Sequence, residues 1–372
     1  APTTSVGKDG DVYLIILSQG KVTLPSTESW TDLSSDGLVT MVVNTNSVPV
    51  AALTTNNGLS WTTSDMPAAS NTLADQYAHV VSNNSDSFVA VRGSIDMSKT
   101  NGKLVYTTDR GTKWNQASTF AGTGSFIPAS VYPDSTAYML FPAFNSDVAY
   151  SSTNGDVWTP ISPSLPFGAA WACAAGARGC YVAIESNTTV GSNRVVYQDF
   201  GNKFVAATME STLVWKSVAT ADGVNYVAVG IAPGGNKNTN VVNYSNNRGA
   251  TWQAATLPST GEWSAVATNG TTFIAIRYGS NKAAYSSDNG RTWSEVTLPE
   301  VRNWSKLIGT TRMYMALATA SSTNAPVAVS TDGGRTWTSD ITGQIADINF
   351  KNSGKWLAYN SGVSGGCQSN AS

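Results

Sequence analysis

Residues 286–293 read Ser-Ser-Asp-Asn-Gly-Arg-Thr-Trp, and six similar octapeptides begin at residues 54, 107, 151, 197, 245 and 330. In each copy a short polar residue is followed two positions later by glycine and five positions later by Trp or Phe. The polar side chain can bond nearby backbone N–H groups, and glycine adopts a positive φ at little steric cost. Each octapeptide therefore predicts a hairpin turn whose aromatic side chain packs back into a sheet.

We call each octapeptide a box and predict a structural role for three positions in every copy. The polar, glycine and aromatic residues at these positions are Asn56, Gly58 and Trp61; Asp109, Gly111 and Trp114; Thr153, Gly155 and Trp158; Asp199, Gly201 and Phe204; Asn247, Gly249 and Trp252; Asp288, Gly290 and Trp293; and Asp332, Gly334 and Trp337.

The boxes close a longer repeat. Residues 24–43 and 257–276 align without a gap, although more than two hundred residues separate them. Each repeat opens on an aromatic residue, 41 to 49 residues after the previous one, and continues with two runs of alternating residues before the box. An alternation of period two is typical of strands. The sequence therefore predicts an all-β chain with four strands in each repeat.

The boxes resemble the Asp-box, or BNR, repeat of sialidases, of the sortilin ectodomain and of related secreted and phage-borne propellers. This resemblance implies a single closed β-propeller of four-stranded blades, with the boxes at the rim and away from any active site. We expect eight blades, the last combining residues 343–360 with N-terminal strands from residues 10–25. Seven blades, with the N-terminal strands in an appended element, are the alternative. Residues 1–360 would form the propeller and 361–372 a flexible Gly/Ser-rich tail.

Composition limits the classes of partner. Only 12% of the residues are charged and the formal net charge is −2, so the chain lacks the basic surface expected of a nucleic-acid-binding protein. No apolar run approaches the ~20 residues of a membrane-spanning helix, so we expect no membrane insertion. With a single histidine and no nucleotide or flavin motif, we expect neither a metal site nor a cofactor. The oligomeric state stays open.

The cysteines leave two interpretations open. Cys173 and Cys180 flank the turn-like stretch Ala-Ala-Gly-Ala-Arg-Gly, so they could face each other across a hairpin and form a disulfide. Two buried thiols are the alternative. Cys367 lies in the Gly/Ser-rich tail.

Sialidase activity is not supported by the residues. The family resemblance would imply an arginine triad that clamps the substrate carboxylate and an Arg-Ile-Pro motif near the start. The nearest string here is Phe126-Ile127-Pro128, and several arginines lie within box turns. We therefore predict a binding or structural protein in preference to an enzyme.

One set of polar residues is predicted to converge. Two positions after the opening aromatic residue, the repeats place Asp32, His79, Lys306 and Asp347 in blades 1, 2, 7 and 8. The set could form an ion-paired lining of the channel, a ligand pocket at its mouth, or a pair of carboxylates, Asp32 and Asp347, for glycoside hydrolysis.

Three functions follow from these patterns. The first is an extracellular, cell-surface or virion-surface module for binding, adhesion or structure, with glycans as one class of ligand for the Asn-, Ser- and Thr-rich loops at residues 93–103, 185–194 and 232–240. The second is a glycoside hydrolase of non-sialidase type. The third is a scaffold that binds another protein during assembly.

Overall fold

Strands form the regular structure of the computed structural model, and the described residues contain no helix. Accordingly, no described segment is a helix long and apolar enough to cross a membrane. The structure describes residues 4–6, 12–14, 30–35, 38–44, 50–55, 61–67, 77–82, 86–92, 104–122, 124–130, 138–177, 180–199, 203–310, 314–318, 327–339, 356–362 and 365–369.

The consecutive strands of each repeat pair antiparallel, and we number the repeats blades 1 to 7 in chain order; blades 4, 5 and 7 are joined through the C-terminal strands into one 12-stranded sheet. The first three blades contain β3 (Trp30–Ser35), β4 (Thr40–Asn44), β5 (Val50–Thr54) and β6 (Thr62–Asp65); β7 (Tyr77–Ser82), β8 (Phe88–Arg92), β9 (Leu104–Thr107) and β10 (Asn115–Gln116); and β11 (Phe126–Ser130), β12 (Tyr138–Pro142), β13 (Tyr150–Ser152) and β14 (Thr159–Pro160).

Blades 4 and 5 share one long strand, because β18 is the fourth strand of one and the first strand of the other. The remaining blades contain β15 (Trp171–Ala177), β16 (Cys180–Glu185), β17 (Ser192–Gln198) and β18 (Phe204–Ala219); β19 (Tyr226–Ile231), β20 (Thr239–Ser245) and β21 (Gln253–Gly261); β22 (Trp263–Thr268), β23 (Phe273–Arg277), β24 (Ser280–Ser286) and β25 (Ser294–Arg302); and β26 (Trp304–Thr310), β27 (Tyr314–Ala318) and β28 (Val327–Ser330).

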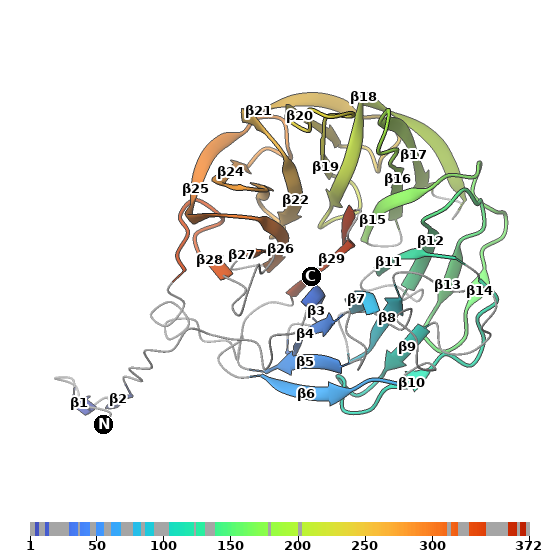
Figure 1. Cartoon of the computed structure of the whole chain (residues 1–372), viewed down its shortest axis with the longest axis horizontal. Coiled ribbons are helices and arrows are strands. Elements are labelled where there is room, and N and C mark those ends of the chain that lie inside the picture. The colour runs from blue at the N-terminus through green and yellow to red at the C-terminus, as the bar shows by residue number, and fades with distance from the viewer. Residues whose placement is uncertain are drawn as a thin grey trace.

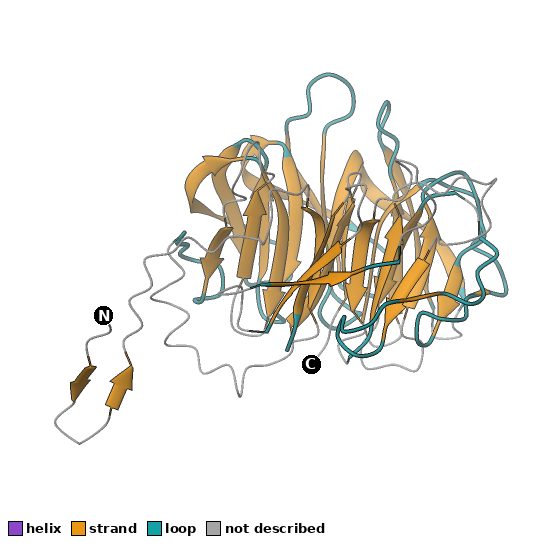
Figure 2. Ribbon diagram, turned by 60° about the horizontal axis from the view of Figure 1, so that its bottom comes forward, coloured by secondary structure: helices purple, strands orange, loops and turns teal. Residues whose placement is uncertain are grey.

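The blades stand around a common centre, with the first strand of each nearest the centre and the fourth near the rim (Figure 1). Neighbouring strands run in opposite directions, so each blade has two ends. The box turns lie at one end, which we call the box face. The second-to-third connections and the links to the next blade lie at the other end, which we call the connection face. Figure 2 shows the strands running between these two faces.

The apolar core lies between blades. Val227 of blade 5, for example, shares a buried cluster with Trp263 and Phe273 of blade 6. Val42 and Ala52 of blade 1 belong to the same cluster as strands β26 to β28 of blade 7. Blades 7 and 1 therefore share one apolar cluster.

The expected count of eight blades stays a prediction, because residues 340–355 lie outside the described residues. The N-terminal strands β1 (Thr4–Val6) and β2 (Val12–Leu14) pair with each other, and Figure 1 places them away from the ring. The C-terminal strands β29 (Trp356–Gly362) and β30 (Gly365–Ser369) pair with each other. In addition, β29 pairs with β26, and β30 pairs with β18. Among the described strands, the N-terminal pair does not join the C-terminal pair in one sheet.

The C-terminal pair also bears on the predicted tail. β29 lies in the middle of the ring in Figure 1. The boundary expected at residue 360 falls within this strand, and residues 365–369, in the predicted flexible tail, form β30.

The boxes adopt a common turn. The polar residue accepts a hydrogen bond from the backbone N–H four positions later, at 2.9 Å in each case, for Asp109, Asp199, Asn247, Asp288 and Asp332. In the copies of Asp109, Asn247, Asp288 and Asp332, a Ser or Thr two positions before the polar residue accepts the glycine N–H, as Ser286 does from Gly290 at 3.0 Å. The polar residue thus bonds the backbone of the turn, and the serine and threonine were missed. Asn56, Gly58 and Gly201 lie outside the described residues.

The box glycines contact the preceding blade. A methyl group on Gly290 would lie 2.6 Å from Val227 Cγ2, and one on Gly155 would lie 2.6 Å from Val89 Cγ2. Both glycines have positive φ angles, of 86° and 87°. The glycine is thus required both by the turn and by the close approach of two blades.

The disulfide interpretation of the cysteines is wrong. Cys173 and Cys180 are buried and form no disulfide, which was the alternative. Cys173 is opposite Ile184, and Cys180 is opposite Ala177. The segment read as a turn mostly continues β15, so the two cysteines do not face each other.

Candidate functional site

A β-bulge marks the candidate position in most of the inner strands. The register shifts between the opening aromatic residue and the residue two positions later in β3, β7, β15, β18, β22 and β26. In blade 3, Pro128 occupies this position and pairs without a shift. A bulge changes the direction of the side chains that follow it. In blades 1, 2 and 7 these side chains belong to Asp32, His79 and Lys306.

The structure brings these three residues together. Lys306 Nζ lies 3.8 Å from Asp32 Oδ1, and His79 Nδ1 lies 3.8 Å from Asp32 Oδ2. Asp32 Oδ2 also accepts a hydrogen bond of 3.0 Å from the Val80 backbone N–H in blade 2. These contacts connect blades 7, 1 and 2. Asp347 lies outside the described residues.

Burial decides what the cluster can do. The Asp32 side chain has no exposed surface, and the exposed fractions of the His79 and Lys306 side chains are 7% and 15%. Burial lowers the pKa of the Lys306 ammonium to about 8, although the negative charge of Asp32 acts in the opposite direction. A carboxylate with no exposed surface cannot meet a substrate. The geometry therefore favours the structural interpretation, in which Asp32 joins three blades.

Ser217 occupies the corresponding position in blade 5. Its hydroxyl lies 3.2 Å from the Val266 backbone nitrogen and 3.3 Å from the Val266 carbonyl oxygen in blade 6. It thus bonds the next blade as Asp32 does. This role was missed because a small uncharged side chain gives no signal of its own, although its position in the repeat is the same.

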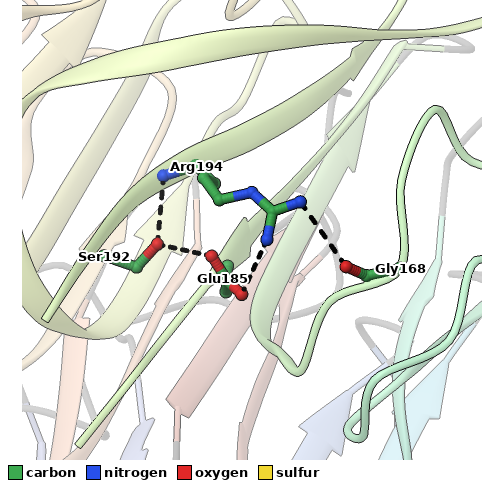
Figure 3. A network of polar contacts seen from close by, with 4 residues as sticks. All are labelled: Gly168, Glu185, Ser192 and Arg194. Carbon is green, nitrogen blue, oxygen red and sulfur yellow. Dashed lines mark hydrogen bonds and ion pairs between the residues drawn. The ribbon is translucent and has the colours of Figure 1, made fainter. Parts of the chain in front are cut away.

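A second polar cluster lies on the connection face of blade 4 (Figure 3). Arg194 Nη1 donates to Glu185 Oε1 at 3.3 Å, and Nη2 donates to the Gly168 carbonyl oxygen at 3.5 Å. Ser192 Oγ donates to Glu185 Oε2 at 2.6 Å. The guanidinium also lies 3.8 Å from the centre of the Phe167 ring. The cluster holds the link from blade 3 against the connection between β16 and β17.

Exposed apolar side chains are unevenly divided between the faces. Among the described residues, the six exposed large apolar side chains are Phe144, Val190, Tyr278 and Val301 at the connection face, and Leu38 and Val157 at the box face. The loop with Val190 also exposes amide and hydroxyl groups of Asn187, Thr188 and Thr189. The connection face of blades 3 to 6 therefore combines apolar and uncharged polar groups.

The comparisons with known proteins address the fold. The family model of the DUF6242 beta propeller domain matches residues 216–350. A solved structure of YCF48 bound to D1 peptide is similar, with a TM-score of 0.57, 14% identity and coverage of 82% of this chain and 94% of that chain. The chain is a β-propeller. No curated protein gives a significant match to its sequence.

Other β-propellers are similar to the same extent. Virginiamycin B lyase from Staphylococcus aureus has a TM-score of 0.59 at 9% identity, covering 82% of this chain and 95% of that one. The RRP9 WD40 repeats have a TM-score of 0.56 at 10% identity, covering 88% and 99%. Likeness at such identities shows the fold alone. The expected propeller is confirmed, and the function has to be argued from the site.

No group of three or more His, Cys, Asp or Glu side chains in the described part of the chain could hold a metal ion.

Proposed function

We propose that this β-propeller is a non-catalytic binding module that holds a protein partner on its connection face. One observation carries the proposal: Asp32, the centre of the predicted polar set, is buried between blades, while four of the six exposed large apolar side chains of the described residues lie at the connection face. Loops on a rigid scaffold commonly carry recognition. The structure of YCF48 bound to D1 peptide supports a protein partner by analogy of fold.

Glycan binding is a second candidate. The exposed residues Asn187, Thr188 and Thr189, together with Asn236 and Asn238, offer amide and hydroxyl groups that can bond sugar hydroxyls. The glycoside hydrolase alternative lacks this kind of support, because Asp32 has no exposed surface.

The proposal has two further parts. We place the chain outside a cell or on a virion because its surface composition is polar and weakly charged. We also assign its repeats to the Asp-box type, and the common hydrogen bonds of the box turns support this assignment. Immunodetection on intact and lysed source cells or particles tests the location.

The binding proposal is tested by probing peptide and glycan arrays with the protein and two variants. Val190→Asp/Tyr278→Asp changes the connection face, and Leu38→Asp/Val157→Asp is the matched control on the box face. We expect saturable peptide binding. The first variant should lose at least tenfold in affinity for the peptide, and the second should keep its affinity. Equal loss in both variants, or the absence of a ligand on either array, would contradict the proposal. Binding to glycans alone would replace the protein partner by the second candidate.

A further inference from the structure

Lys216 lies at the bulge of the inner strand of blade 5. Its neighbours Trp215 and Ser217 are both fully buried. Trp215 Nε1 donates a 2.7 Å hydrogen bond to the Ser192 carbonyl oxygen of blade 4, and Ser217 bonds Val266 of blade 6. The backbone that carries Lys216 is therefore fixed on both sides, while Lys216 itself is only half-buried.

The ammonium of Lys216 has no acceptor in the described structure. No described side chain or carbonyl group bonds to it or forms an ion pair with it. Two other cations of the connection face differ: Arg194 pairs with Glu185 at 3.3 Å, and Arg302 pairs with Glu300 at 2.6 Å. A partly buried charge without a partner is unfavourable. The free energy of binding an anion would therefore be more favourable at Lys216 than at the paired cations.

Two further charges act on the pKa of Lys216. Burial lowers the pKa of Lys216, the positive charge of Lys237 lowers it further, and the negative charge of Glu262 acts in the opposite direction. Lys237 belongs to the exposed connection between β19 and β20, and Glu262 to the link between β21 and β22. Two lysines and one glutamate leave a local formal charge of about +1. This charge matches a carboxylate better than a phosphate dianion.

We infer that Lys216 and Lys237 form a binding site on the connection face for a carboxylate group of a peptide. The inference rests on the proposed function and names the chemistry of its partner. Lys216 is the fixed contact, since its strand is rigid, and Lys237 is the contact on the loop. A peptide is favoured over an acidic sugar because Val190 and Tyr278, both exposed, lie on the same face and can hold its apolar side chains.

The experiment measures binding to three sets of immobilised peptides. The first contains Asp and Glu and has an amidated C-terminus, the second is neutral with a free C-terminal carboxylate, and the third is neutral and amidated. The variants are Lys216→Met, which removes the charge at similar length, Lys216→Arg, which keeps it, and the control Lys282→Met. Lys282 is a described lysine that already pairs with Glu295. Thermal unfolding of each variant confirms that it is folded.

We expect binding to one or both carboxylate sets, a loss of at least tenfold in Lys216→Met, and retention in Lys216→Arg and Lys282→Met. The set that binds shows whether the carboxylate belongs to a side chain or to a chain end. Binding to neutral amidated peptides that Lys216→Met leaves unchanged would overturn this inference and keep the proposed function. Binding in no set would overturn both. Capture of sialylated glycans in place of peptides, with the same dependence on Lys216, would overturn the peptide as the ligand.

Discussion

The carboxylate of Asp32, in the first blade of the chain, lies 3.8 Å from the ammonium of Lys306, in the last blade. Removing one partner of a buried pair leaves the other charge uncompensated, at a cost of about 3–5 kcal/mol. Asp32→Asn keeps an acceptor for the Val80 N–H and removes the charge, so we expect it to lower the free energy of unfolding by about this amount. We expect a smaller loss for Lys306→Met, because burial already disfavours that ammonium. Urea denaturation of both variants measures the difference, and an equal or larger loss in Lys306→Met would contradict it.

The pH dependence of stability follows from Lys306. Its pKa falls from 10.5 to about 8 on folding, so the folded protein releases this proton first as the pH rises. Between pH 8 and 10.5 the unfolded state holds more protons, and the contribution of this group to stability therefore increases with pH. Relative to that of Lys306→Met, the free energy of unfolding of the protein should increase by about 1–3 kcal/mol across this pH range. Denaturation at pH 7, 8, 9 and 10 tests this, since other titrating groups are common to both proteins. A difference that stays constant or falls would refute it.

Two glycines separate backbone strain from close packing. Gly290 and Gly270 have φ angles of 86° and 93°, but only Gly290 lies close to other atoms, whereas a methyl group on Gly270 would have nothing within 4 Å. We expect Gly270→Ala to cost about 1–2 kcal/mol, from the left-handed backbone alone. Gly290→Ala should cost about 1–3 kcal/mol more, because its methyl group would press on Val227. Thermal or urea unfolding compares them, with Gly235→Ala as a control of near-zero effect. Equal losses for the first two variants would argue against the blade contact.

Two opening tryptophans differ in one hydrogen bond. Trp215 and Trp171 are both almost fully buried. Trp215 Nε1 donates to Ser192 at 2.7 Å, whereas Trp171 Nε1 has no acceptor among the described residues. Both Phe variants lose similar volume, so the comparison isolates the bond. We expect Trp215→Phe to cost about 1–2 kcal/mol more than Trp171→Phe, since it leaves a buried carbonyl group without its donor. The midpoints of urea unfolding measure this, and a larger loss for Trp171→Phe would be contrary evidence.

Much of the fold could be predicted from the sequence because the repeat places equivalent residues in equivalent positions. The box turns and the convergence of Lys306, Asp32 and His79 follow from this equivalence. The number of blades does not, because the alternation of a terminal strand is the same whichever sheet it joins. The burial of Asp32 could not be predicted from the sequence either, since only the packing of neighbouring blades shows that this side chain is covered. Lys216 was overlooked because the feature that distinguishes it is the absence of an acceptor for its ammonium group among the described residues. A sequence pattern does not show which side chains lack a partner.

The contact between each box glycine and the preceding blade affects how such a chain can change in evolution. Blades 2, 5 and 6 each carry both halves of this contact, a glycine that approaches one neighbour and an apolar side chain that receives the glycine of the other, as blade 5 does through Gly249 and Val227. Duplication or deletion of a whole repeat in the gene therefore restores the contact at the new junction without a compensating mutation. Loss of part of a repeat leaves one half without its counterpart. Gains and losses in related genes should accordingly begin and end at the same point of the repeat.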